Sequence, residues 1–180
     1  MWSEGDLALS TERFELRPLA KSDAGGLLAH FGDAQVVEHM DIDPLRTLSQ
    51  AQEIIAWATD IRAEGQGVRW AVRAKGGQRL IGTCGFNVLE FQRGRRGEIA
   101  YDLAVTWWGQ GVMAEVLPVV LAYGFEALEL RRIEAMVTPG NDRSVRLLER
   151  HGFQLEGRLR DHAFWKGRFW DQLVYARLAS

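Results

Sequence analysis

The stretch TWWGQGVMAEVL, residues 106–117, decides how the chain folds, because two glycines join an apolar strand pattern to an apolar helix pattern. Gly109 and Gly111 allow positive backbone φ and the close approach of a ligand. The first amides of the following helix have no partner inside the helix, and the helix dipole makes that end positive. A turn of this kind suits a phosphate or pyrophosphate. Such turns also occur without a ligand, so the stretch alone leaves both interpretations open.

Two common phosphate motifs are absent from the sequence. There is no GxxxxGK[ST] loop, which argues against a nucleoside-triphosphate site. There is also no GxGxxG after the first predicted strand, which argues against a dinucleotide-binding fold.

Hydrophobic periodicity predicts the elements on either side of this stretch. Alternating or continuous apolar runs predict strands at 13–19, 68–74, 79–89, 98–105, 131–137, 153–159 and 171–178. Helical spacing predicts helices at 22–31, 49–61, 109–128 and 141–152. The order βααβββαβαββ indicates a mixed α/β domain (an α+β mixed sheet), with an antiparallel meander before a strand–helix–strand crossover. The aromatic segment RDHAFWKGRFW, residues 160–170, is predicted to be a loop.

Helix ends and breaks are also visible in the sequence. Ser49 and Gln52 have the spacing of a capping box for the second helix. Asn141 suits the N-cap of the last helix, and Gly152 suits its C-terminal end. Pro118 falls inside the helix predicted for 109–128, where it is expected to kink the helix or mark a late start.

Composition predicts one soluble domain over residues 1–180, since 47% of the chain is hydrophobic and 26% is charged. The net charge of -2 gives no reason to expect nucleic acid or a membrane surface as partner. Residues 1–14 contain acidic side chains and no long apolar run, so neither a signal peptide nor a membrane span is expected. The single Cys84 favours a reducing, cytoplasmic setting, and the histidines show no metal-binding spacing.

Four motifs in order resemble the GCN5-related N-acetyltransferase (GNAT) superfamily, and more narrowly its ribosomal-protein N-terminal acetyltransferases (RimJ/RimL-like). WGQGVMAEV at 108–116 resembles the W-G-x-G-Y-x-T-E-A loop that binds the coenzyme A pyrophosphate. NDRSVRLLERHGF at 141–153 resembles N-x-x-S-x-x-x-x-E-x-x-G-F, and EGRLRD at 156–161 follows as it does in that subfamily. LSTERFELRPLAKSDA at 9–24 resembles the subfamily's opening strand and helix. Together the motifs span nearly the whole chain.

The resemblance implies the acyl-CoA N-acyltransferase fold, with the central sheet splayed at the cofactor strand. It implies that a primary amine attacks acetyl-CoA directly, with no metal. The acceptor is a protein N-terminal α-amine or a small-molecule amine, and the sequence leaves monomer and homodimer open. The implied contacts to the co-substrate are Leu103, Ala104, Val105, Trp108, Gly109, Gln110, Gly111, Val112, Met113, Ala114, Asn141, Arg143 and Ser144.

An amine acceptor arrives largely protonated, because an α-amine has a pKa of about 8 and a lysine about 10.4. A base must therefore remove a proton, directly or through water. Glu98 is the candidate, because its strand resembles the one on which histone-type members carry a glutamate base. A solvated carboxylate with no catalytic role is the alternative. Asp102 shares the same face of that strand and is the second candidate, and ordered water is the third.

Three positions depart from the broad family. Trp108 stands where many members have glutamine or arginine, and Met113 stands where they have glycine or alanine. Leu148 stands where many members have the tyrosine that protonates the leaving thiolate. In the resembled subfamily an earlier serine or asparagine lies near the sulfur, and by position these are Ser144 and Asn141. Met113 and Leu148 favour a competing hypothesis, a catalytically degenerate module that binds or senses coenzyme A.

Overall fold

The computed structural model describes residues 7–179. Residues 1–6 and Ser180 lie outside the described residues. Residues 1–6 belong to the segment for which neither a signal peptide nor a membrane span is expected. The chain forms an eight-stranded mixed sheet in the order β1-β2-β3-β4-β5-β6-β8-β7. The strands are β1 (Leu9–Ser10), β2 (Phe14–Pro18), β3 (Val68–Ala74), β4 (Leu80–Glu90), β5 (Arg96–Leu103), β6 (Arg132–Val137), β7 (Gln154–Trp165) and β8 (Arg168–Leu178). The helices are α1 (Ala24–Phe31), α2 (Leu48–Ala63), α3 (Val112–Ala122) and α4 (Asp142–Arg150).

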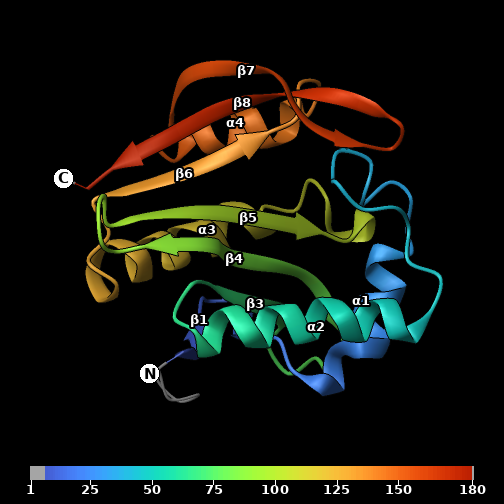
Figure 1. The fold of residues 1–180 in the computed structure, drawn as a ribbon. Helices are drawn as coiled ribbons and strands as arrows, with labels where there is room; N and C mark the ends of the chain where they lie inside the picture. The colour runs from blue at the N-terminus through green and yellow to red at the C-terminus, as the bar shows by residue number, and fades with distance from the viewer. Residues whose placement is uncertain (1–6, 180) are drawn as a thin grey trace.

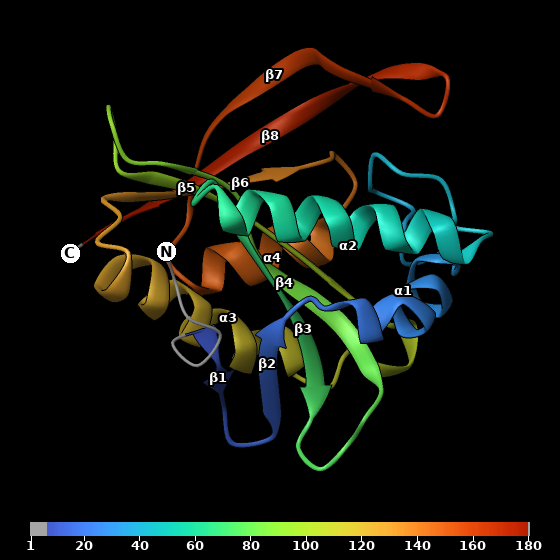
Figure 2. The same cartoon turned by 60° about the horizontal axis from the view of Figure 1, so that its bottom comes forward.

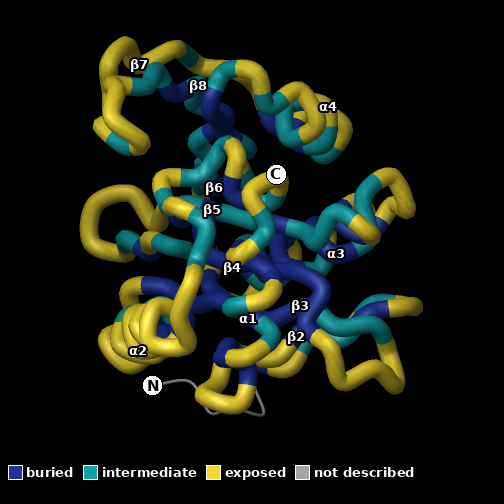
Figure 3. Tube along the Cα trace, turned by 90° about the vertical axis from the view of Figure 1, so that its right-hand side faces the viewer, coloured by how far each residue is buried: buried dark blue, intermediate teal, exposed yellow. Residues whose placement is uncertain are grey.

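The helices cover both faces of the sheet, as Figures 1 and 2 show. Helices α1 and α2 pack on one face through Leu27, Ala51 and Ile55. On the other face α3 and α4 bury a larger core, whose most enclosed side chains include Trp70 and Phe86. Figure 3 shows β3 and β4 largely dark blue, whereas the helices carry yellow on their outer sides. The predicted mixed α/β class and element order are confirmed, with β1 as an additional strand of two residues.

The central sheet opens between β5 and β6, as predicted. These parallel strands pair at Arg96 with Arg132, Gly97 with Ile133 and Glu98 with Glu134. Beyond Glu98 strand β5 continues to Leu103 but pairs only with β4 on its other side. Figure 1 shows β5 and β6 diverging from this point.

The cap of α2 and the segment at 160–170 differ from the sequence prediction. Thr47, not Ser49, caps α2: its hydroxyl accepts from the Gln50 amide at 3.3 Å, and the Gln50 side chain accepts from the Thr47 amide at 3.1 Å. The predicted aromatic loop at 160–170 belongs to the β7–β8 hairpin, which turns at Lys166 and Gly167. Cross-strand ring pairs explain why this segment is extended, and they join Phe164 to Phe169 and Trp165 to Trp170.

Pro118 lies on the exposed side of α3, and the helix continues through it from Val112 to Ala122. The alternative of a late helix start is therefore wrong. Proline has no amide hydrogen to donate to the carbonyl four residues earlier, which belongs to Ala114. That carbonyl oxygen lies 3.3 Å from Nε2 of His151, at the end of α4. The proline thus leaves an acceptor that ties α4 to α3.

Leu148 is completely buried among α3, α4 and the sheet. We expect Leu148→Ala to lower the free energy of unfolding by about 2–5 kcal/mol, because truncating a buried leucine loses apolar burial and leaves a cavity. Chemical denaturation measures the change. The matched control is Leu155→Ala, since Leu155 is 54% exposed. Equal stability of the two variants would contradict a structural role for Leu148.

Candidate active site

The glycine turn has the backbone geometry of an anion site. Gly109 and Gly111 have φ of 74° and 72°, the left-handed region, and Gly111 is the N-cap of α3. The amides of Val112, Met113 and Ala114 fall in the first turn of the helix, where no intrahelical acceptor is available. The side chains of Val112 and Met113 are buried in the core. Met113 therefore points away from the side on which an anion would meet these amides.

Trp108 connects the turn to the strand and to α4. Its indole Nε1 donates to the Leu103 carbonyl at 2.8 Å. The Arg143 guanidinium lies over its ring, 4.1 Å from the ring centroid. The side chain of Gln110 folds back and donates to the Thr106 carbonyl at 2.7 Å. The turn therefore offers an anion its backbone amides, with Arg143 held close by.

Strand β5 presents part of its backbone to the opening beside β6. The Ala104 amide donates to Ile81 of β4 at 2.8 Å, so the alternation of an antiparallel ladder directs the amides and carbonyls of Tyr101 and Leu103 away from β4. Tyr101 was missed by the sequence analysis, although its position two residues before Leu103 puts it on the same edge. Its backbone amide and carbonyl face the place where a pantetheine arm would run.

The predicted strand 98–105 is too long at its C-terminal end, because β5 ends at Leu103 and Val105 begins a short 3-10 turn. The carbonyls of Ala104 and Val105 accept from the amides of Trp107 and Trp108 within that turn. Both backbone groups of Ala104 are thus paired within the protein.

Asn141 and Ser144 lie together at the start of α4, across the opening from β5. Asn141 is the N-cap, as predicted, and its Oδ1 accepts from the Ser144 amide at 3.3 Å. The Ser144 hydroxyl lies 2.6 Å from the Tyr101 hydroxyl. Burial raises the pKa of the Tyr101 phenol well above its usual value, so the phenol stays protonated, and either hydroxyl can donate in this hydrogen bond. When Tyr101 donates, the Ser144 hydrogen is free to point elsewhere in the opening.

Glu98 is half-buried at the last position where β5 pairs with β6, opposite Glu134. Burial and then the negative charge of Glu134 raise the pKa of the Glu98 carboxyl. Asp41 adds to this shift, while Arg96 and His162 oppose it. Besides Arg96 on its own strand, three other segments therefore act on Glu98: β6, the α1–α2 connection and β7. A carboxylate with a raised pKa at the apex of the opening is a stronger base than an ordinary glutamate.

Asp102, the second candidate base, is buried and fully engaged. One of its oxygens accepts from the Thr83 amide at 2.8 Å and lies 2.6 Å from His30 Nε2. The other accepts from the Thr83 hydroxyl at 2.6 Å and lies 3.4 Å from the Arg69 guanidinium. Burial acts to raise the pKa of Asp102, but the hydrogen bond from His30 and the charges of His30 and Arg69 outweigh it, so the pKa is lowered. This geometry suits a structural anion that joins α1 to the sheet.

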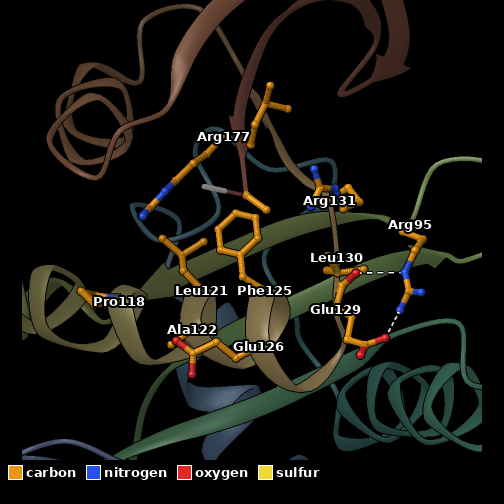
Figure 4. A pocket seen from close by; sticks show the side chains of 12 residues that line it. Arg95, Pro118, Leu121, Ala122, Phe125, Glu126, Glu129, Leu130, Arg131 and Arg177 are labelled. Atoms are coloured by element: carbon orange, nitrogen blue, oxygen red, sulfur yellow. Dashed lines mark hydrogen bonds and ion pairs between the residues drawn. The ribbon is translucent and has the colours of Figure 1, made fainter.

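A pocket of about 670 Å³ lies at the other end of α3, beside Pro118 and Phe125 (Figure 4). Arg95 and Arg177 also line it, and Arg95 pairs with Glu129 at 2.5 Å. None of the residues predicted for the site lines this pocket. The predicted residues lie instead on β5, on the glycine turn with the start of α3, and at the start of α4, and two of them, Ala104 and Val105, line a smaller cavity against α1.

A family profile described as an acetyltransferase (GNAT) domain matches residues 13–154. The chain belongs to this family. The resemblance carried by the four motifs is therefore confirmed, and the protein is a GNAT acetyltransferase. It is 41% identical over 170 residues to the uncharacterized N-acetyltransferase p20 of Bacillus licheniformis, across 94% of this chain and 95% of that one.

More distant relatives extend the comparison. The GNAT chain is 24% identical over 175 residues to the ribosomal protein uS5-alanine N-acetyltransferase of Escherichia coli, across 93% of this chain and 89% of that one. Its fold matches that of Mycobacterium smegmatis RimJ in complex with CoA-disulfide, with a TM-score of 0.86, 22% identity, and coverage of 96% and 87% of the two chains. At 22% identity, the structural match establishes that the two chains share a fold.

The described residues, 7–179, contain neither a helix suited to cross a membrane nor a cluster of metal ligands. No helix among them is long and apolar enough to cross a membrane. No group of three or more His, Cys, Asp or Glu side chains among them is placed to hold a metal ion.

We expect Ser144→Ala to reduce kcat within about tenfold, because a thiolate already leaves readily near neutral pH and needs only a modest donor. Tyr101→Phe should produce a loss of similar size, since it removes the partner that orients the Ser144 hydroxyl. Steady-state rates and melting curves, measured together, should show slower turnover with the fold intact. The control is Tyr175→Phe, which removes a phenol whose hydroxyl lies 3.4 Å from Glu149. Full activity in Ser144→Ala would remove Ser144 from the chemistry.

Proposed function

We propose that this GNAT enzyme transfers an acetyl group from acetyl-CoA to a primary amine. The observation that carries the proposal is the opening between β5 and β6, which runs from the glycine turn at Gly109 and Gly111 to the half-buried Glu98. The turn matches the charge of a pyrophosphate. The free edge of β5 suits an extended, amide-bearing pantetheine arm, as an open sheet edge suits an added peptide strand. Relatives whose names or titles include coenzyme A or acetyl-CoA support the same co-substrate.

In this proposal Glu98 accepts a proton from the bound ammonium, directly or through one water. The neutral amine then attacks the thioester carbonyl, so that a carbon–nitrogen bond forms and negative charge develops on the carbonyl oxygen. A backbone amide on the free edge of β5 is proposed to stabilise that oxygen. The carbon–sulfur bond then breaks, and Ser144, oriented by Tyr101 and Asn141, donates a hydrogen bond to the leaving thiolate. The second proton of the attacking nitrogen passes to the thiolate, either through the Ser144 hydroxyl or through solvent, which leaves a neutral amide and a free thiol.

The amine is proposed to enter between the α1–α2 connection and the β7–β8 hairpin. Lys166 at the hairpin tip donates to the Val37 carbonyl at 2.6 Å, and the Thr138 hydroxyl donates to the His39 carbonyl at 3.1 Å. The first bond joins the two walls of the entrance, and the second joins the α1–α2 connection to the loop that follows β6. Glu134 is paired with Arg96 and Arg132, so the Glu98 carboxylate supplies the negative charge that is proposed to attract an ammonium group.

A protein N-terminal α-amine and a small-molecule amine both fit this chemistry. Relatives named as ribosomal-protein alanine or serine acetyltransferases support a protein N-terminal α-amine.

Three further proposals concern the chain as a whole: a single domain over 1–180, a monomer or homodimer, and a cytoplasmic location. The last is supported by one unpaired cysteine, Cys84, whose thiol pKa burial raises to about 12. The net charge of -2 gives no support for nucleic acid as partner.

A paired experiment tests the function. Thermal melting is followed against acetyl-CoA concentration, and thiol release is measured with peptides bearing free N-termini, the same peptides N-acetylated, and polyamines. We expect a higher melting temperature with acetyl-CoA and thiol release that requires a free amine. A raised melting temperature without thiol release for any acceptor would favour the competing hypothesis of a binding or sensing module. If acetyl-CoA neither raised the melting temperature nor released thiol with any acceptor, the proposal would be contradicted.

A further inference from the structure

Glu115, in the first turn of α3, is held by the turn between β1 and β2. Its Oε1 accepts from the Thr11 hydroxyl at 2.5 Å and from the Arg13 amide at 2.8 Å. Its Oε2 accepts from the Arg13 Nε at 2.6 Å. The hydrogen bonds from Thr11 and Arg13 lower the pKa of Glu115 to about 2, so the carboxylate is charged at any pH where the enzyme is assayed. The N-terminal hairpin is thereby joined to the start of the helix.

The same Arg13 side chain reaches the glycine turn. Its Nη1 and Nη2 both donate to the Gln110 carbonyl oxygen, each at 3.2 Å. Its Nη2 lies 3.7 Å from the position that a Cβ on Gly111 would occupy. One guanidinium therefore bridges the Glu115 carboxylate and the peptide group between Gln110 and Gly111.

The direction of that peptide group matters for an anion. In a trans peptide the carbonyl oxygen of Gln110 and the amide hydrogen of Gly111 point in opposite directions. When Arg13 binds the oxygen, the Gly111 amide hydrogen is directed to the opposite side. A carbonyl oxygen that turned toward the site would instead repel a phosphate. No side chain at Gly111 holds this conformation, and the two hydrogen bonds from Arg13 hold the Gln110 carbonyl from outside the turn.

We propose that Arg13, held by Glu115, is a positioning residue for the turn that binds the co-substrate pyrophosphate. This inference rests on the proposed function. Arg13 acts by fixing the Gln110–Gly111 peptide, so its contribution belongs to the pyrophosphate of the donor and not to the acetyl group or the amine. Loss of Arg13 should therefore raise KM for an acetyl donor that carries a pyrophosphate. It should leave the kinetics unchanged for an acetyl donor that lacks one.

The test compares two acetyl donors, acetyl-CoA and S-acetylpantetheine, which has no pyrophosphate. We expect Arg13→Ala to raise KM for acetyl-CoA by about tenfold, the usual weight of a hydrogen bond to a charged group, with kcat little changed. Its kcat/KM with S-acetylpantetheine should equal that of the wild type. Glu115→Gln should show the same pattern more weakly, and the double variant should lose no more than Arg13→Ala, because the two side chains act as a unit.

Arg17→Ala is the matched control. Arg17 lies on the same strand, β2, pairs with Glu15 at 3.6 Å, and its side chain is 69% exposed. It should leave both donors unaffected. If Arg13→Ala does not fold, Arg13→Lys serves as the second variant, because lysine keeps the charge but cannot bridge Glu115 and the Gln110 carbonyl as a planar fork does.

An unchanged KM for acetyl-CoA in both Arg13 variants, or an equal loss with both donors, would overturn the inference. The first result would show that the turn is held without Arg13, and the second would show a general loss of structure. Failure of the proposed function gives a different result, since the wild-type enzyme would then show no turnover with acetyl-CoA.

Discussion

Gly111→Asp is expected to abolish acetyl-CoA binding, with a loss of affinity of at least about 100-fold. The substitution places a carboxylate beside the pyrophosphate, and the juxtaposition of like charges costs several kcal/mol. It also forces a side chain into the left-handed conformation that Gly111 adopts, with φ of 72°. Isothermal titration calorimetry with acetyl-CoA measures the loss.

Two controls separate charge from backbone strain at this position. Gly111→Ala carries the strain without the charge and should weaken binding less than Gly111→Asp. Gly76→Asp places the same carboxylate on a glycine of similar φ, 74°, where a Cβ meets nothing within 4 Å. Gly76 lies in the turn between β3 and β4, so its substitution should leave affinity unchanged. Unchanged affinity in Gly111→Asp would show that the pyrophosphate does not bind at this turn.

Glu98→Gln is expected to lower kcat by about 10²–10⁴, the usual contribution of a general base, with little change in affinity for acetyl-CoA. The wild-type rate should rise with pH as Glu98 loses its proton, and its raised pKa places this rise above the usual range of a glutamate. The variant should lack that rise. Full activity of Glu98→Gln across pH 6 to 9 would remove Glu98 from the mechanism and leave ordered water as the base.

Glu134→Gln provides a second test of the same assignment. The negative charge of Glu134 helps raise the pKa of Glu98, because it disfavours a second charge nearby. Removing that charge should move the rise of rate with pH to lower pH. Glu134 also pairs with Arg132 at 2.5 Å and Arg96 at 3.1 Å, so a melting curve of the variant is needed beside the pH profile. A pH profile that does not move would indicate that Glu98 is not the titrating group.

The turn and its helix were predictable from the sequence because their signal is local. Gly109 and Gly111 fall where a strand pattern changes to a helix pattern, and the structure gives both the expected positive φ. Asn141 was likewise predicted as a cap from its position at the start of an amphipathic segment, and it caps α4. In each case the residue and the structural feature it forms lie within a few positions of each other in the sequence.

The features that were missed depend on contacts between distant segments. The hairpin at 160–170 lacked alternation, and its strands are stabilised by aromatic pairs that form only once the two strands meet. The contact between Tyr101 and Ser144 joins residues 43 positions apart, and that between Arg13 and Glu115 joins residues 102 positions apart. The orientation of Asp102 toward His30 likewise required the packing of α1 on the sheet. Periodicity reports the face of an element and not its partner.

A structure of the enzyme with coenzyme A would test the assignment of the co-substrate site. We expect pyrophosphate oxygens within hydrogen-bonding distance of the amides of Gly111, Val112 and Met113. We also expect the pantetheine arm between β5 and β6, with the sulfur between Glu98 and Ser144. Coenzyme A bound elsewhere, for example in the pocket beside Pro118 and Phe125, with the opening between β5 and β6 empty, would contradict this assignment.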